Sequence, residues 1–318
     1  MKAASASGTG GLVIALGRCA DERAEVFVRP AGGPLADGCR IVGTLAGPRR
    51  GRDTTLPVTV RLQPTVAGGP ARAILTEPAY WTPGLPNLYR LEARLEGGAE
   101  PACATDRLVG LRRFGVRGRS LWLDGHRWVP RAVAASGSDA LAACKAAAVA
   151  AVITEPDEPL LAQADAIGVA VVAVVSSATS ADPAAVVAML AAWAAHPAAV
   201  VAVLPAGLSP DLVAAIALES RPRRDTLLLA ATVAGAVPPP ASIPAGVDVL
   251  AVAFDPGGTP HEAWREGAAV PLVAWRREPT MPAMGRGPCD ALQATLAAWG
   301  IAGGRDRLVW DWAGYVVA

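Results

Sequence analysis

Eight short apolar runs recur between residues 128 and 312, and most are followed by an alanine-rich segment long enough for a helix. Unbroken apolar runs are typical of strands buried on both faces, as in parallel sheets covered by helices. Eight such units in about 200 residues predict a compact (β/α)8 TIM barrel, near the lower size limit of that fold. The runs predict strands at 128–134, 152–154, 169–175, 199–204, 226–231, 247–254, 271–275 and 308–312. The segments between them predict helices at 139–148, 158–167, 182–195, 210–219, 261–266 and 288–299, with a proline-rich loop at 237–244 in place of the fifth helix.

A doubly wound open sheet has the same alternation of strands and helices and is the alternative fold. Its dinucleotide-binding form carries a GxGxxG motif directly after the first strand, where phosphates meet the N-terminus of a helix. No such motif follows residues 128–134. The closed barrel is therefore the fold that the sequence favours.

The composition changes near residue 120. Before it, short runs with alternating apolar residues, such as 24–28, 57–62 and 88–95, are separated by turns rich in glycine and proline. Short strands at this spacing predict an antiparallel sandwich. We therefore expect two domains, a β-sandwich over 1–118 and a TIM-barrel-like domain over 119–318.

Charge and cysteine content exclude several classes of function. The chain has 29 Lys and Arg and 28 Asp and Glu, so its net charge of +1 offers no broad basic face for nucleic acid. Its 5 cysteines lie far apart with no CxxC pair, which argues against a disulfide framework. With only 3 histidines and no HExxH motif, no metal site and no cofactor are expected.

Residues 183–208 are apolar enough to resemble a membrane span, but His196-Pro197 interrupts them and alanine contributes little to insertion. They predict a buried helix followed by a buried strand, and no transmembrane segment is expected. The apolar stretch at 12–16 is shorter than the core of a signal peptide. We therefore expect no signal peptide, and the cytoplasm is favoured over the periplasm.

A segment at the end of the β-rich part carries a family resemblance. It reads YWTPGLPNLY at residues 80–89. It resembles the LWSPExPxLY strand of the immunoglobulin-like domain in glycoside hydrolase family 2, the β-galactosidase and β-glucuronidase group. Further along, FGVR at 114–117 resembles that family's FGFR, and LWLDGHRWVPR at 121–131 resembles the segment that leads into its barrel.

Weaker matches follow in the family's order within the barrel. The sequence DAIGV at 165–169 is similar to DExGixV, and HPAAV at 196–200 is similar to HPSII. The sequence VWDW at 309–312 is similar to the closing region of the family's barrel. The resemblance covers residues 77–312 and implies an immunoglobulin-like sandwich followed by a TIM barrel.

The resemblance also implies which positions would carry catalysis. Retaining glycosidases use two carboxylates across the scissile bond, one as acid/base and one as nucleophile. In this family they are glutamates after the fourth and seventh barrel strands. Aligned on the motifs, they fall on Gly207 and Arg276. Neither residue can protonate a leaving oxygen or attack a sugar, so the alignment implies a degenerate member that is not an enzyme.

A shift of register would restore one carboxylate, because Glu278 lies two residues after Arg276. Its partner would then be Glu155, after the second predicted strand, or Asp255, after the sixth. Solvated loop charges are the ordinary interpretation of such acids.

Three tryptophans lie at the last two predicted strands, Trp275, Trp310 and Trp312. An indole at a barrel mouth can stack on a sugar, which makes these three the candidates for carbohydrate binding. Filling the core is the alternative role for each, and the one favoured in a chain with few large side chains.

The favoured function is a non-catalytic structural or accessory subunit, or a scaffold, that binds protein partners in a larger assembly, with a membrane-associated assembly among the options. Trp193, Trp264 and Trp299 lie on predicted outer helices, where an outward indole would suit a protein partner. The alternative is a carbohydrate-active enzyme or a carbohydrate-binding protein that uses the barrel mouth. Fold analogy alone does not identify the partner.

Overall fold

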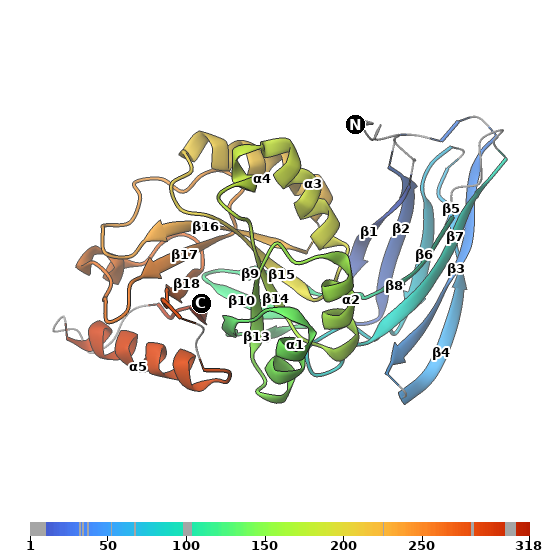
Figure 1. Cartoon of the computed structure of the whole chain (residues 1–318). Helices are drawn as coiled ribbons and strands as arrows, with labels where there is room; N and C mark the ends of the chain where they lie inside the picture. The colour runs from blue at the N-terminus through green and yellow to red at the C-terminus, as the bar shows by residue number, and fades with distance from the viewer. Residues whose placement is uncertain are drawn as a thin grey trace, which may run out of the picture. The chain divides into compact units, whose positions relative to one another are not determined.

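The computed structural model describes residues 11–31, 33, 35–36, 38–51, 53–66, 68–97, 104–224, 226–280, 283–302 and 310–318. The chain divides into two compact units (Figure 1). The first comprises Met1–Tyr80 and Asn87–Leu111, and the second comprises Trp81–Pro86 and Arg112–Ala318. The short segment Trp81–Pro86 therefore belongs with the barrel, although the chain on both sides of it belongs to the first unit.

The first unit is an antiparallel β-sandwich. One sheet has the strand order β1-β2-β6-β5 and the other the order β4-β3-β7-β8. Strand neighbours such as Val26 and Ala73 in one sheet, and Leu45 and Leu91 in the other, are buried in a single apolar cluster. This shared core confirms the predicted sandwich. The strands are β1 Leu12–Cys19, β2 Arg23–Pro30, β3 Arg40–Arg50, β4 Asp53–Arg61, β5 Gln63–Pro64, β6 Ala71–Thr76, β7 Leu88–Glu96 and β8 Ala104–Val109.

A three-stranded antiparallel sheet opens the second unit. It consists of β9 Phe114–Arg117, β10 Ser120–Leu123 and β11 His126–Arg127, with Phe114 opposite Leu123. These two residues and Leu121 are buried in the same cluster as the barrel strands. The compact unit consequently begins at Arg112, whereas a boundary between 118 and 119 would divide this sheet.

Eight parallel strands close into a barrel, because β12 pairs with both β13 and β19. This closure confirms the predicted fold class over the doubly wound alternative. Inward-facing valines and alanines such as Val152, Val172 and Ala251 form its core. The strands are β12 Arg131–Ala134, β13 Ala150–Thr154, β14 Val171–Val174, β15 Ala199–Leu204, β16 Leu228–Ala234, β17 Val249–Phe254, β18 Leu272–Arg276 and β19 Gly314–Val317.

Helices lie outside the barrel strands (Figure 1). The described residues 235–248, between β16 and β17, contain no helix, as the proline-rich loop predicts. No helix among the described residues is long and apolar enough to cross a membrane. The helices are α1 Gly137–Ala146, α2 Glu158–Ile167, α3 Pro183–Ala194, α4 Pro210–Arg224 and α5 Gly287–Ile301, with 3-10 turns η1 Thr179–Ala181 and η2 Glu262–Glu266.

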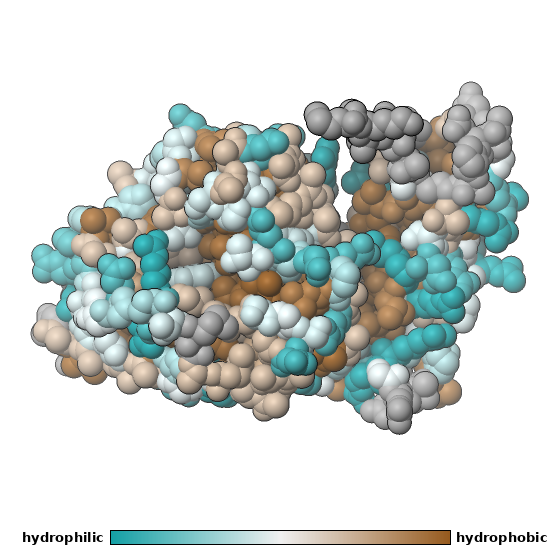
Figure 2. Space-filling model, in the orientation of Figure 1, coloured by the Kyte–Doolittle hydropathy of each residue, from teal (hydrophilic) through white to brown (hydrophobic). Residues whose placement is uncertain are grey.

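Alanine is abundant on the outer faces of these helices. The exposed alanines include Ala142 and Ala146 on α1, and Ala291 and Ala294 on α5. The region of both helices is largely pale brown in Figure 2. Alanine has the highest intrinsic helix propensity, so it stabilises these helices without contributing a strongly apolar surface.

The eighth strand differs from the prediction. The described part of the predicted strand, residues 310–312, lies outside any strand, and the eighth strand is β19 at Gly314–Val317. The run Gly314–Val317 pairs with both β12 and β18, and the two indoles before it are buried by aromatic packing. Trp312 meets Phe254 edge to face with ring centroids 5.9 Å apart, and Trp310 meets Trp312 at 5.0 Å. Residues 308 and 309 lie outside the described part of the chain.

Candidate functional site

The barrel has one closed end and one open end. Four side chains close the end at which the strands begin, because they pack against the barrel core. They are Phe114, Leu121, Leu123 and the half-buried Trp128. Active sites of such barrels lie at the other end, where the strands finish. We call this end the mouth and define it by the last inward-facing residue of each strand and the loop residues that follow.

Small side chains line much of the mouth. Thr154 follows the inward-facing Val152 by two positions on β13, and Thr232 follows Ala230 in the same way on β16, so both face inward. Thr154 is exposed, and Thr232, Val174 and Trp275 are half-buried. The uppermost layer of the barrel is therefore open to solvent.

Trp275 is the aromatic residue of this layer. It lies on β18, packs against the barrel core and stays half-buried. Trp310 and Trp312 are only 6% and 4% exposed, and the indole nitrogen of Trp310 donates to the carbonyl oxygen of Arg265 at 3.0 Å. Of the three tryptophans considered from the sequence, Trp275 alone offers a partly exposed ring.

Arg276 and Glu278 form an ion pair at the end of β18. The Arg276 Nε lies 2.6 Å from Glu278 Oε1, and both side chains are about one fifth exposed. The backbone nitrogen of Glu278 donates to the carbonyl oxygen of Ala318, whose own nitrogen donates to the carbonyl oxygen of Arg276. These bonds hold the carboxylate of Glu278 beside the last residue of the barrel.

Glu155 directly follows β13 and has a positive φ of 47°. Hydrogen bonds from the hydroxyls of Thr179 and Ser176, together with one from the Ser176 backbone nitrogen, hold the pKa of Glu155 below its ordinary value. The Ser176 nitrogen lies 3.2 Å from Glu155 Oε1. These hydrogen bonds stabilise the ionised form of Glu155.

Asp255 and Gly207 occupy exposed loops at the same end. Asp255 directly follows β17, and its carbonyl oxygen accepts a hydrogen bond from the Gly258 nitrogen at 2.9 Å. Gly207 lies three residues after β15 with φ of 90°, a conformation that favours glycine. A Cβ at Gly207 would meet open space, so backbone conformation and not crowding favours glycine there.

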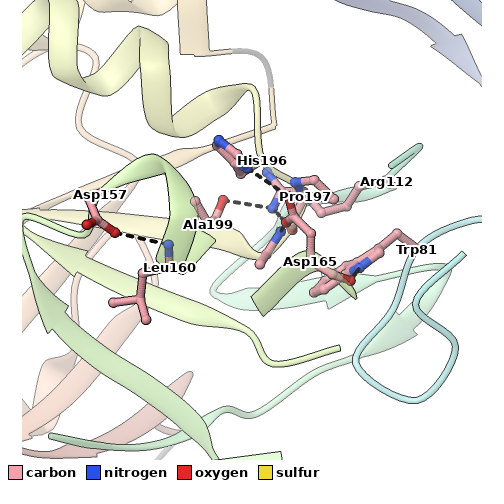
Figure 3. A network of polar contacts seen from close by, with 9 residues as sticks. Trp81, Arg112, Asp157, Leu160, Asp165, His196, Pro197 and Ala199 are labelled. Atoms are coloured by element: carbon pink, nitrogen blue, oxygen red, sulfur yellow. Dashed lines mark hydrogen bonds and ion pairs between the residues drawn. The ribbon is translucent and has the colours of Figure 1, made fainter. Parts of the chain in front are cut away.

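A buried polar network that the sequence did not single out lies at the opposite end (Figure 3). Asp165 of α2 accepts from three groups: its Oδ2 lies 2.7 Å from His196 Nδ1, its Oδ1 accepts from the Ala198 nitrogen, and its carbonyl oxygen accepts from Trp81 Nε1. The two segments quoted as DAIGV and HPAAV therefore contact each other. This contact links α2 to the residues that enter β15.

Arg112 extends the same network and is 1% exposed. Its guanidinium donates to the carbonyl oxygens of Pro197 and Ala199 and to the hydroxyl of Thr226. All three acceptors lie at or just before the starts of β15 and β16. Residues at this end of a barrel support the fold, so we assign the network a structural role.

The tryptophans expected on outer helices also pack within the second unit. Trp193 donates to the Pro156 carbonyl oxygen at 3.0 Å, and Trp264 donates to that of Val237 at 2.8 Å. The Arg265 guanidinium stacks on Trp299 at 4.7 Å, and Trp299 is 9% exposed. These indoles are therefore core residues and not an exposed surface for a partner.

Two cysteines near the barrel are poor nucleophiles. Burial raises the pKa of both Cys144 and Cys289 to about 11. The thiolate is the reactive form, and it is scarce at neutral pH when the pKa is this high. Among the described residues, no group of three or more His, Cys, Asp or Glu side chains is arranged to hold a metal ion.

The sandwich and the closed barrel with an open mouth together define a fold like that of glycoside hydrolase family 2. Neither a family model nor a curated protein matches the sequence. Solved structures do match. A β-D-glucuronidase of Dictyoglomus thermophilum is 14% identical with a TM-score of 0.65, covering 96% of this chain and 61% of that protein.

Two further structures come from Bacteroides. A β-glucuronidase of Bacteroides uniformis is 13% identical with a TM-score of 0.60, covering 96% of this chain and 45% of that protein. A glycosyl hydrolase family 2 member of Bacteroides cellulosilyticus is 14% identical with a TM-score of 0.65, covering 98% and 45%. The chain spans less than two thirds of each of these three proteins, and the likeness is one of fold.

This comparison corrects one conclusion from the sequence. The alignment of Gly207 and Arg276 with the catalytic glutamates led to the expectation that the chain is not an enzyme. The structures that share its fold are named as glycosidases, which contradicts that expectation. The expected role as a non-catalytic accessory subunit has no support in these likenesses.

Proposed function

We propose that this chain is a carbohydrate-active protein that binds a glycoside at the mouth of its barrel. The observation that carries the proposal is the half-buried indole of Trp275, which lies on the inner face of β18 beside the Arg276–Glu278 ion pair. The likeness in fold to β-glucuronidases supports the same end of the barrel as the binding site.

The groups at the mouth suit both the apolar face and the hydroxyl groups of a sugar ring. The flat apolar ring of Trp275 would take the C–H face of a pyranose, since indoles combine apolar area with little conformational freedom. In the loop after β18, the exposed Arg277 would donate hydrogen bonds to hydroxyl groups, and Glu278 would accept them. Together these groups would orient the ring in the open layer of the barrel.

Hydrolysis of a glycosidic bond is the reaction that the carboxylates at the mouth would serve. One carboxyl group must donate a proton to the leaving oxygen, while the other stays ionised. Because the pKa of Glu155 is lowered, Glu155 fits the ionised role, as nucleophile or as stabiliser of the developing cation. The proton donor would then be Asp255, or Glu278 if substrate binding breaks its ion pair with Arg276, because that pair favours the ionised carboxylate.

The exposed Arg277 suits an acidic substrate. It lies in the loop after β18 at the mouth, whereas the guanidinium of Arg276 is already paired with Glu278. Guanidinium groups bind carboxylates with paired hydrogen bonds. An aryl β-D-glucuronide is therefore the first substrate to test, with the corresponding galactoside as the neutral comparison.

We expect the purified chain to cleave 4-nitrophenyl β-D-glucuronide faster than an enzyme-free blank. Glu278→Gln should reduce kcat by about 10²–10⁴-fold, because this is the usual contribution of a general acid or base. The same loss in Asp255→Asn, with Glu278→Gln active, would identify Asp255 as the donor. The measurement is release of 4-nitrophenolate under saturating substrate. Glu219→Gln, which removes an exposed carboxylate of α4, is the control and should retain full activity.

Two results would contradict the hydrolytic assignment. One is the absence of turnover with every aryl glycoside. The other is turnover that Glu278→Gln, Asp255→Asn and Glu155→Gln all leave unchanged, since no carboxylate at the mouth would then take part.

A further inference from the structure

A cavity of about 380 Å³ lies at the end of the barrel opposite the mouth. Its walls include Trp128 and Pro130, which precede β12, and Ala150 and Ala170, which lie at or just before the starts of β13 and β14. Because all eight strands are parallel, these positions mark the end at which the strands begin. The cavity is therefore separate from the proposed glycoside site.

Three cationic side chains line the cavity, namely Arg131, Lys145 and Arg286, and no acidic residue does so among the lining residues that the structure describes. Arg131 is neutralised, since it forms an ion pair with Asp290 and donates to Gln293 Oε1 at 2.6 Å. Among the residues that the structure describes, no carboxylate pairs with Lys145 or Arg286.

Lys145 is held in place by carbonyl groups. Its Nζ donates to the Pro83 carbonyl oxygen at 2.6 Å and lies 3.4 Å from that of Gly168. Carbonyl oxygens orient an ammonium group and leave its net charge uncompensated. Within the described ranges, the guanidinium of Arg286 makes no hydrogen bond or ion pair, and it is exposed at the N-cap of α5.

The rest of the lining is apolar. It includes the half-buried indole of Trp128, the ring of Pro130, Val149 and the buried Cys144, a neutral thiol with a pKa of about 11. A volume of about 380 Å³ is at the small end of the range for ligand pockets. An occupant would combine a ring-sized apolar body with one negative charge.

We propose that this cavity binds a small organic anion, with its apolar body against Trp128 and Pro130 and its carboxylate or phosphate group between Lys145 and Arg286. Such a ligand would join the 81–86 segment, α1 and the start of α5. Because it would bind the folded state only, it would also raise the stability of the barrel unit.

Isothermal titration of the full chain at low salt tests this proposal, with phenylacetate and phenyl phosphate as anionic probes and 2-phenylethanol as the neutral match. We expect at least one anion to bind with a stoichiometry of one and to raise Tm, and 2-phenylethanol to bind at least about tenfold more weakly. The preferred anion identifies the head group. Arg286→Gln should weaken anion binding by about tenfold or more, because the Arg286 side chain supports no other described contact.

Two control variants distinguish binding in this cavity from nonspecific binding to surface charge and from binding at the mouth. Arg223→Gln removes an exposed guanidinium on α4 and should leave the affinity unchanged, as should Trp275→Ala. Any one of three results would overturn the proposal. The first is that 2-phenylethanol binds as tightly as the anions, and the second is that Arg286→Gln and Arg223→Gln weaken anion binding equally. The third is that neither anion binds at millimolar concentration. Failure of the glycoside experiments would leave this result unaffected.

Discussion

Arg112→Met is expected to lower the free energy of unfolding of the barrel unit by about 3–5 kcal/mol, because three acceptors lose their donor at about 1–3 kcal/mol each. The substitution keeps much of the side-chain volume. It leaves the carbonyl oxygens of Pro197 and Ala199 and the hydroxyl of Thr226 without their donor in a site that is 1% exposed. Unsatisfied buried acceptors lose their solvation with no compensating bond.

Urea unfolding followed by tryptophan fluorescence measures this effect on the barrel alone. All 9 tryptophans lie in Trp81–Pro86 or Arg112–Ala318, so the signal contains no contribution from the sandwich. Arg113→Met is the matched control. Its partner Asp124 is one third exposed, and such surface pairs contribute about 1 kcal/mol or less. Equal losses in the two variants would contradict the structural role of Arg112.

Asp165→Ala is expected to cost about 2–4 kcal/mol, because the buried Ala198 nitrogen and the half-buried His196 ring lose their acceptor at once. The Ala198 nitrogen bonds Asp165 Oδ1 at 2.8 Å and the His196 Nδ1 bonds Oδ2 at 2.7 Å. Asp165→Asn keeps an oxygen for Ala198 and should retain a substantial part of this stability. The bond from Trp81 goes to the backbone oxygen of residue 165 and should survive in both variants.

Asp157→Ala provides the comparison on the same helix. Asp157 caps α2 by accepting a hydrogen bond from the Leu160 nitrogen at 3.0 Å, and loss of an N-cap costs about 1 kcal/mol (Figure 3). Urea unfolding monitored by fluorescence again measures both. If Asp165→Ala cost no more than Asp157→Ala, the Asp165–His196 contact would not support the barrel as described.

The sequence within and next to an element was enough to predict the first and last residues of several elements. Helix α2 has its predicted bounds because Asp157 caps its start and Gly168, with φ of 75°, ends it. Strand β15 also has its predicted bounds, since its six residues are all buried and every one is alanine, valine or leucine. In both, the sequence carries the information within the element itself.

The last strand shows what local signals miss. Trp310 and Trp312 have a high propensity for strands, yet their indoles are buried against Phe254 and each other, outside any strand. Propensity reports what suits a pleated surface and cannot distinguish a strand from an aromatic contact made by a loop.

The acids of the candidate site were found because they follow predicted strands, and parallel strands all end at one side of a barrel. Glu155 and Asp255 directly follow β13 and β17, and Glu278 comes two residues after β18. Arg112 could not be found in this way. It is one of 29 basic residues, and its burial depends on carbonyl groups some 85 residues along the chain.

Binding of a glycoside at the mouth is tested most directly by titrating the protein with non-cleavable thio-β-glycosides of glucuronic acid, galactose, glucose and mannose. We expect at least one, foremost the glucuronide, to bind with a stoichiometry of one, and Trp275→Ala to weaken it by about tenfold or more. Trp122→Ala removes another half-buried indole, on β10 at the closed end, and should leave the affinity unchanged. No binding by any of the four glycosides, or equal affinity in the wild-type protein and Trp275→Ala, would contradict a glycoside site at the mouth.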